Sequence, residues 1–189
     1  MIKKIPDIEI INSIQHGNKD DFRLLVDRYK DRAFSMLKRM LKNEMEAEEV
    51  LQDSFIKAFN SINNFRGDAK FSTWFYKIVY NTCLSVLSNQ KRKREIEYIS
   101  IDENFDIGAN DNQIYAQAEN ANEYLYKLID LLPIRYSLII ILFYMDNLSI
   151  NEISNILDIS IVNVKVMLFR ARNELKDLMI KHNYQKEYN

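Results

Sequence analysis

Residues 148–178 decide the fold; they read LSINEISNILDISIVNVKVMLFRARNELKDL and predict two helices separated by a short turn. Ser149 and Glu152 form the signature of a capping box, so a helix begins at this point. Asp158-Ile159 interrupts its apolar pattern, and Ser160 offers the N-cap of a second helix. Two helices joined this tightly are typical of a helix-turn-helix, whose second helix enters the major groove of DNA. From spacing alone, an ordinary helical hairpin is as well supported as a helix-turn-helix.

The second helix has two distinct faces. Apolar residues at alternating spacings of four and three predict a buried face, made up of Val164, Leu168, Ala171, Leu175 and Leu178. The opposite face carries Val162, Asn163, Val166, Phe169, Arg170 and Asn173, with Lys165, Arg172 and Lys176 on its flank. This outer face mixes cations with apolar side chains, so the helix alone does not identify its ligand. The rest of the chain has to decide it.

Composition predicts an all-α protein. Gly and Pro are scarce (3 and 2 of 189 residues), 47% of the residues are apolar, and alternating strand-like patterns are hard to find. The single cysteine, Cys83, cannot form an internal disulfide, and no signal peptide opens the chain, so we expect a reducing cytoplasm. The longest apolar run, residues 138–144, is too short to span a bilayer, and we expect no membrane insertion.

Charge is divided along the chain, although the net charge is only −1. Residues 1–94 hold 18 Lys and Arg against 12 Asp and Glu. Residues 95–120 hold 7 acids and no Lys or Arg, and residues 121–189 hold 8 charges of each sign. We predict two small helical domains, at 1–94 and 120–189, joined by a flexible acidic linker at 95–119.

Three helices are expected at the start of the first domain: a short one capped by Asp7, then helices over residues 20–42 and 45–61. The second has a core stripe of Phe22, Leu25, Tyr29, Phe34, Leu37 and Leu41. The third begins with five acids, Glu44, Glu46, Glu48, Glu49 and Asp53. Acids in a first turn stabilise the helix dipole, but five exceed that need and indicate a surface for a basic partner protein.

A loop and a helix rich in aromatic residues follow. The loop is centred on Gly67, and the helix begins at Ser72. Six aromatic residues within sixteen, interleaved with Arg66, Lys70 and Lys77, are typical of a site that stacks single-stranded bases and binds phosphates. The alternative is that the rings pack in the helical core, and we expect this for at least half of them.

Two sets of motifs cover almost the whole chain. The first, in residues 17–94, comprises Gly17, Phe22, Tyr29, residues 47–59 (AEEVLQDSFIKAF), Phe65-Arg66-Gly67-Asp68, Phe71-Ser72-Thr73-Trp74 and Asn81. The second comprises Leu132-Pro133, residues 148–153 (LSINEI), Val164-Lys165 and Phe169-Arg170-Ala171-Arg172. In this order and spacing the chain resembles the sigma factors of bacterial RNA polymerase, in the small extracytoplasmic-function (ECF) group of the sigma-70 family. The first set resembles the promoter-melting domain and the second the promoter-reading domain.

The resemblance implies a reversible specificity subunit for promoter recognition, DNA melting and transcription initiation at a specific regulon, with no catalytic residue, cofactor or metal of its own. It assigns binding to core RNA polymerase to Glu49, Gln52 and Asp53. It assigns binding of the melted −10 promoter element to Arg66, Gly67, Asp68, Lys70, Phe71, Trp74, Lys77 and Asn81. It assigns the duplex −35 element to Asn163, Lys165, Val166, Phe169 and Arg170. An anti-sigma factor is a further implied partner, and the acidic linker would either thread through polymerase channels or act only as a tether.

The chain departs from this group at the groove-facing start of its last helix. Where the group commonly has Gly-Thr-Val-Lys-Ser-Arg, this chain has Val162-Asn163-Val164-Lys165-Val166-Met167, which removes a positive charge and turns two valines outward. We hypothesise that −35 recognition here depends on apolar contact with thymine-rich DNA. The alternative is that this face binds a partner protein.

Three other functions compete with this interpretation. A DNA-binding regulator with sensory N-terminal helices needs only the helix-turn-helix, so the acidic third helix and the Phe-Arg-Gly-Asp loop argue against it. A regulator that binds core polymerase and blocks other sigma factors would lack promoter-dependent initiation. An enzyme is disfavoured because His16, His182 and Cys83 show no nucleophile–base or metal-ligand spacing.

Overall fold

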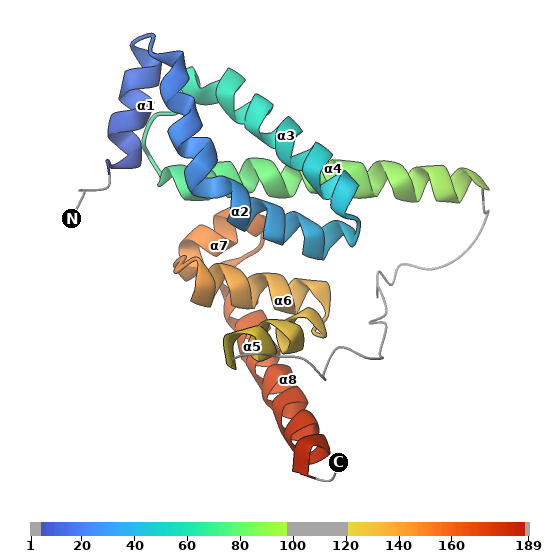
Figure 1. Cartoon of the computed structure of the whole chain (residues 1–189). Coiled ribbons are helices and arrows are strands. Elements are labelled where there is room, and N and C mark those ends of the chain that lie inside the picture. Colours follow the sequence, from blue (N-terminus) through green and yellow to red (C-terminus); the bar gives the residue numbers. More distant parts are fainter. Residues whose placement is uncertain (1–4, 98–120, 188–189) are drawn as a thin grey trace. The chain divides into compact units, whose positions relative to one another are not determined.

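The computed structural model describes residues 5–97 and 121–187, which belong to two separate units (Figure 1). Both described ranges are helical and contain no strand, which confirms the all-α prediction. Of the linker expected at 95–119, residues 95–97 extend the last helix of the first unit, and residues 98–119 lie outside the described ranges. None of the helices in these ranges has the length and hydropathy that crossing a membrane requires.

The first unit consists of α1 (Asp7–Gln15), α2 (Phe22–Leu41), α3 (Glu44–Ser61) and α4 (Phe71–Glu97), with short 3-10 turns η1 (Lys19–Asp21) and η2 (Ile62–Asn64). Helices α2, α3 and α4 pack against one another, and α1 lies against α2 (Figure 1). The apolar side chains that are 0% exposed define its core: Leu25, Ala33, Leu37, Ala47, Ala58, Phe75, Val79 and Cys83. The helices thus bury one face each and present the other face to solvent.

Asp7 does not cap α1 as the sequence predicted. Pro6 occupies the N-cap position, and the Asp7 carboxylate instead accepts hydrogen bonds from Arg28 and Tyr29 of α2. Burial, and then the hydrogen bond to Asp7, raise the pKa of the Tyr29 hydroxyl above its ordinary value. The hydroxyl therefore stays protonated and donates at neutral pH, and the Asp7 carboxylate fixes α1 to α2.

The core stripe expected on α2 is correct for four of its six residues. Phe22, Leu25, Tyr29 and Leu37 are buried, but Phe34 and Leu41 are partly exposed. The buried positions include instead Ala33, Met36 and Met40, which lie on the side of α2 that meets α3 and α4. Because one helix packs between two others, its buried face is wider than a single stripe at 3.6-residue spacing.

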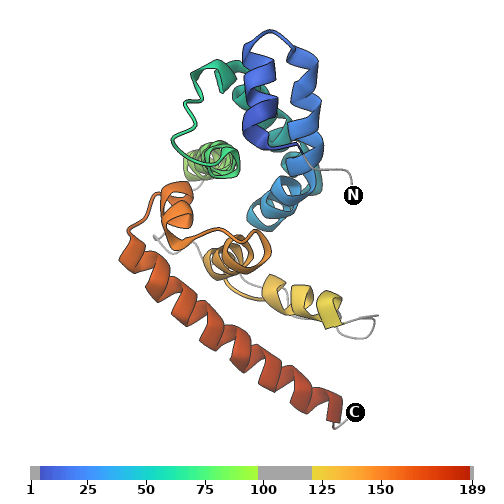
Figure 2. The ribbon, with the colours of Figure 1, turned by 90° about the vertical axis from the view of Figure 1, so that its left-hand side faces the viewer.

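The second unit consists of α5 (Ala121–Asp130), α6 (Ile134–Ile140), α7 (Ile150–Leu157) and α8 (Ile161–Glu187). A π-helical segment, η4 (Ile141–Met145), continues α6 and ends with a hydrogen bond of 3.0 Å from the Asp146 N–H to the Ile141 carbonyl. Helices α5, α6 and α7 all contact α8, which Figure 2 shows as one long helix that follows α7 after a tight turn.

The capping signals predicted around α7 and α8 are confirmed. Ser149 Oγ accepts from the Glu152 N–H at 3.3 Å, and the Glu152 carboxylate accepts from the Ser149 N–H at 2.8 Å, which completes the capping box. Asp158 ends α7 in the left-handed region, at φ 54°. Ser160 Oγ then accepts from the Asn163 N–H at 3.2 Å in the first turn of α8. Residues 158–160 alone separate the two helices, as a helix-turn-helix requires.

Candidate functional site

Four acidic side chains of α3, Glu44, Glu48, Glu49 and Asp53, are exposed, and the fifth, Glu46, is partly buried. Asn43 caps the helix, because its side-chain oxygen accepts from the N–H groups of Met45 and Glu46 at 3.0 and 3.3 Å. Glu49, Gln52 and Asp53 are exposed, and their spacings of three and one place them on one side of the helix. The opposite side of α3 faces α2 and α4. The three residues assigned to polymerase binding are therefore together and accessible.

The loop between η2 and α4 presents charged side chains to solvent. Arg66, Asp68 and Lys70 are exposed, and Gly67 has a φ of +79°, which only glycine adopts without strain. The turn made by Gly67 places two cations and one carboxylate within five consecutive residues. This part of the predicted −10 surface has the accessibility that DNA binding requires.

The first half of α4 continues this surface. Lys77 and Asn81 are exposed, and Trp74, one helical turn earlier, is partly exposed. Their spacings of three and four put the three residues on one face of α4. The Trp74 ring packs edge-on against Phe65, with the ring centroids 5.3 Å apart. This contact holds the partly exposed indole at the edge of the loop.

Phe71 differs from the other assigned residues of this region because it is buried. It was assigned to the −10 surface, but its side chain is only 2% exposed. Its ring stacks on Phe75 at 5.8 Å and lies 5.3 Å from the Tyr29 ring. Phe75 and Tyr76 are also buried, so half of the six aromatic residues are core, as expected. In this conformation the Phe71 ring packs between the loop and the core, and neither of its faces is open to a base.

Gln15 is a residue of this region that the sequence did not reveal. Its Nε2 donates to the carbonyl of Ile62 at 2.8 Å and to the carbonyl of Phe65 at 3.2 Å. Ile62 lies in η2 and Phe65 at the start of the loop, 47 and 50 residues further along the chain. No local pattern around Gln15 signals these contacts, because they depend entirely on the tertiary fold.

The two faces of α8 are arranged as its spacing predicts. Val164, Leu168 and Ala171 are at most 3% exposed, and Leu175 and Leu178 are partly buried. The opposite face is open to solvent: Val162 is 68% exposed, Phe169 64% and Val166 41%, and Asn163, Lys165 and Arg170 are exposed beside them. Every residue assigned to the −35 element is therefore accessible.

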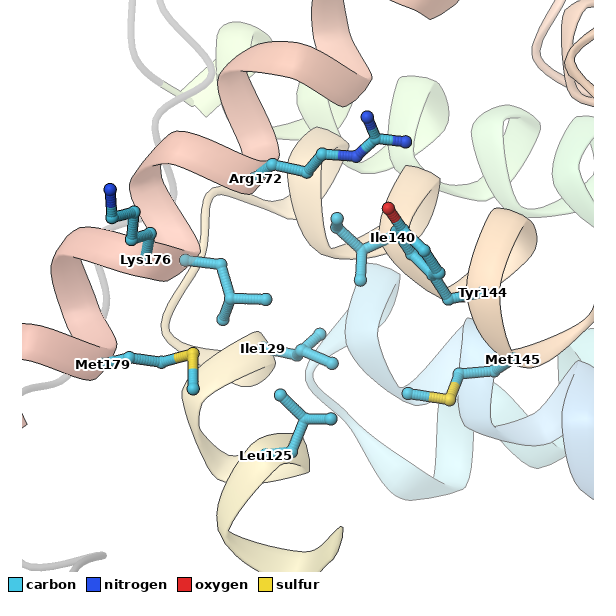
Figure 3. A pocket seen from close by; sticks show the side chains of 9 residues that line it. Leu125, Ile129, Ile140, Tyr144, Met145, Arg172, Lys176 and Met179 are labelled. Atoms are coloured by element: carbon cyan, nitrogen blue, oxygen red, sulfur yellow. The ribbon is translucent and has the colours of Figure 1, made fainter.

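Arg172 differs from its neighbours on α8. Its guanidinium lies over the rings of Phe143 and Tyr144, at 5.7 and 5.5 Å from the ring centroids. It also borders an apolar cavity of about 300 Å³ to which Leu125 and Ile129 of α5 contribute (Figure 3). Expected on the flank of the DNA-facing surface, Arg172 instead stabilises the contact of α8 with η4.

Cys83 is enclosed in the core of the first unit. Burial, with a smaller contribution from the Glu46 carboxylate, raises the pKa of its thiol to about 12. The thiol is therefore protonated and unreactive at neutral pH. Within residues 5–97 and 121–187, no group of three or more His, Cys, Asp and Glu side chains is placed to hold a metal ion.

Comparison with known proteins identifies both units. Residues 25–93 match the family model for sigma-70 region 2, and residues 122–175 match the model for sigma-70 region 4. The ECF RNA polymerase sigma-E factor of Haemophilus influenzae is 31% identical over 192 residues, covering 95% of this chain and all of the relative. The factor of the same name from Salmonella typhimurium is 31% identical over 183 residues, covering 93% of this chain and 95% of the relative.

The fold is also that of a solved sigma factor. The Bartonella quintana sigma factor RpoE, solved in complex with the anti-sigma factor NepR, superimposes with a TM-score of 0.65 at 20% identity, covering 84% of this chain and 96% of that one. The family models match most of each described unit, and the curated relatives extend the match over nearly the full length. The chain therefore belongs to the sigma-70 family of RNA polymerase sigma factors, in its ECF group.

Proposed function

We propose that this chain binds core RNA polymerase through α3, reads the −35 element with α8, captures the melted −10 strand at the loop before α4, and so directs initiation at a specific regulon. The observation that carries the proposal is the exposure of these three residue sets. Apart from Phe71 and the partly exposed Trp74, every assigned residue lies open to solvent on an element whose other face forms the core. Sigma factors are non-catalytic specificity subunits, and the proposal gives this chain that role in the cytoplasm.

The polymerase contact is the first part to test. We expect the purified chain to co-elute with core RNA polymerase in size-exclusion chromatography, and Asp53→Arg to abolish co-elution because it reverses one charge of the exposed acidic set. Asp31→Arg is the matched control, since Asp31 is an equally exposed acid on α2. Co-elution of the Asp53 variant at the parent's level would remove α3 from the polymerase interface.

Run-off transcription from fragmented genomic DNA, with the reconstituted polymerase, then identifies the promoters. Specific transcripts that require the chain support the proposal. Binding to polymerase without any new transcript would favour the competing function, a regulator that occupies core polymerase and blocks other sigma factors. Binding to duplex DNA without binding to polymerase would identify a free-standing regulator.

For the −10 strand, the proposal assigns phosphate contacts to Arg66, Lys70 and Lys77, and base contacts to Trp74 and Asn81. Extruding a base costs a few kcal/mol, which stacking and a fitted pocket offset. Gly67 and Asp68 shape the turn between the cations. Phe71 acts in this scheme only by supporting the loop, because its ring is buried.

For the −35 duplex, we propose that Val162, Val166 and Phe169 contact thymine methyl groups, while Lys165 and Arg170 bind phosphates or guanine edges and Asn163 a phosphate. The charge of this face supports a DNA ligand: Lys165 and Arg170 are exposed on it, and residues 159–173 contain no acid. A helix presenting apolar groups between cations fits the major groove, where the thymine methyl is the apolar feature of the base pairs.

Deoxyuridine provides a direct test of the methyl contacts, because it removes only the thymine methyl. We expect substitution in the −35 duplex to weaken binding by about fourfold per contacted methyl. Val166→Ser should lose this sensitivity at one position and retain it at the others. Equal binding of the parent to thymine and uracil duplexes would overturn apolar readout while leaving the sigma function intact.

An anti-sigma factor is a proposed regulatory partner. The solved sigma factor RpoE of Bartonella quintana is in complex with such a protein, the anti-sigma factor NepR. For this chain, the outward apolar side chains of α8 are the surface where an anti-sigma factor would compete with DNA. Loss of promoter duplex binding on adding the partner, restored by excess duplex, would identify that competition.

A further inference from the structure

The loop over residues 65–70 is held from two sides. On the α4 side, the Phe65 ring contacts Phe71 and Trp74, with centroids 6.0 and 5.3 Å apart. The Lys70 carbonyl accepts from the Trp74 N–H at 3.2 Å and starts α4. These contacts fix the two ends of the loop to α4.

The second side of the loop rests on α1. The Gln15 amide donates to the carbonyls of Ile62 and Phe65, so one side chain joins η2 to the first residue of the loop. Ile8, two turns earlier on α1, lies beside the turn itself: a Cβ placed at Gly67 would be 3.7 Å from Ile8 Cδ1. Helix α1 thus touches the loop at its base and at its tip.

Helix α1 is itself anchored firmly enough to act as a support. Ile10, Ile11 and Ile14 are at most 4% exposed, and they pack its inner face into the core of the unit. Asp7 accepts from Arg28 and Tyr29 of α2, and the Arg28 guanidinium also donates to the Ile5 carbonyl at 2.8 Å. The apolar face and the Asp7 contacts both hold α1 against α2.

We propose that α1 is part of the promoter-melting machinery and that Gln15 is a positioning residue, which holds the loop at Arg66–Lys70 in the conformation that captures the −10 strand. Residues 7–15 precede the range 25–93 that matches sigma-70 region 2, so the family match does not include this helix. The inference rests on the proposed function of the loop and adds to it a residue that touches no DNA.

The physical basis is preorganisation. A loop that is ordered before the strand arrives loses less conformational entropy on binding, and the saved entropy appears as affinity. Gln15 supplies two neutral hydrogen bonds at the edge of the protein. Their loss should weaken capture of the −10 strand by about five- to tenfold, the change that about 1 kcal/mol of net hydrogen bonding gives.

The test compares three full-length proteins: the parent, Gln15→Met and Asn12→Ala. Methionine keeps the length of the glutamine side chain and removes both donors. Asn12 is exposed on the same helix, so its variant controls for general effects of changing α1. Each is assembled with core polymerase and titrated with a fluorescent single strand that carries the −10 segment of a promoter mapped by run-off transcription. Nuclear magnetic resonance order parameters of the backbone amides at residues 65–70 are measured on the free chains.

We expect Gln15→Met to bind the strand about five- to tenfold more weakly than the parent, with lower order parameters in the loop and unchanged affinity for polymerase. Asn12→Ala should match the parent in all three measurements. Parent-like strand binding by Gln15→Met would overturn the inference, and so would equal loss in both variants. If the parent itself captures no strand, the proposed function of the loop fails, and unchanged order parameters in Gln15→Met would then overturn the positioning role as well.

Discussion

The two surfaces assigned to DNA are built in opposite ways. At the loop and α4, the apolar side chains turn inward and the polar ones outward: Phe71 and Phe75 are 2% and 0% exposed, while Arg66, Lys70 and Lys77 face solvent. On α8, apolar side chains themselves face solvent, with Val162 68% and Phe169 64% exposed. The comparison teaches that aromatic content along the sequence is a weak sign of a binding surface, whereas several large apolar side chains left exposed on one face of a folded helix are a more informative one.

The difference fits the two forms of DNA. A single strand is flexible, so a surface that captures it needs cations for the phosphates and an ordered loop that receives a base. A duplex is much stiffer than a single strand, and a rigid helix in its major groove can match thymine methyl groups to fixed apolar side chains. The first surface therefore depends on how well its loop is held, and the second on which side chains α8 displays.

The largest expected effect concerns Phe71. We predict that Phe71→Ala lowers the free energy of unfolding of the first unit by about 3–5 kcal/mol, because it opens a cavity among packed rings. Lys70→Ala, one residue earlier and exposed, should change it by less than about 0.5 kcal/mol. Urea unfolding followed by tryptophan fluorescence measures this unit specifically, since Trp74 is the single tryptophan of the chain. If Phe71→Ala keeps the parent's stability but loses strand binding, Phe71 is part of the DNA surface. The contrast between the two surfaces would then be wrong.

Adjacent residues of α8 provide the next test. Leu168→Ala should destabilise the second unit by about 2–5 kcal/mol, because Leu168 is 3% exposed and packs in the core. Phe169→Ala should change the stability by less than about 0.5 kcal/mol and weaken −35 duplex binding instead. Far-UV circular dichroism follows the unfolding, with Trp74 fluorescence as the internal control for the first unit. A large loss of stability in Phe169→Ala would mean that its ring is structural.

The smallest effect concerns salt dependence, and it separates the two surfaces by their cations. Arg170→Ala should reduce the slope of log affinity against log salt for the −35 duplex by about 0.9, the value for one phosphate of B-DNA. Lys77→Ala should reduce the slope for the −10 single strand by about 0.7. Each variant serves as the control for the other ligand. A change of slope with the wrong ligand would show that the two surfaces do not divide the promoter as proposed.

Signals within one or two helical turns could be predicted from the sequence. The Ser149–Glu152 capping box, the Ser160 cap and the buried face of α8 all depend on neighbours at most four residues apart along a helix. These local rules were sufficient to predict where the helix-turn-helix lies and which face of its second helix is exposed. The same holds for the exposed acidic set on α3, whose spacing assigns it to one side of the helix.

Contacts between distant residues could not be predicted in this way. Asp7 has the residue type and position of an N-cap, but its carboxylate accepts hydrogen bonds from Arg28 and Tyr29, 21 and 22 residues away. Gln15 has no local partner at all, and its acceptors come from η2 and the loop. The burial of Phe71 could not be predicted for the same reason, since only the packing of α2 against α4 shows which aromatic rings lie in the core.

The buried thiol of Cys83 makes the protein convenient to label. With a side chain that is 0% exposed and a pKa of about 12, Cys83 offers no thiolate to a maleimide at pH 7. A cysteine introduced at an exposed position, such as Asn60→Cys on α3 or Asn155→Cys on α7, would be the reactive one. A pair of fluorophores at these two sites would follow the separation of the two units, in the free chain and on polymerase, in a protein that keeps its native cysteine.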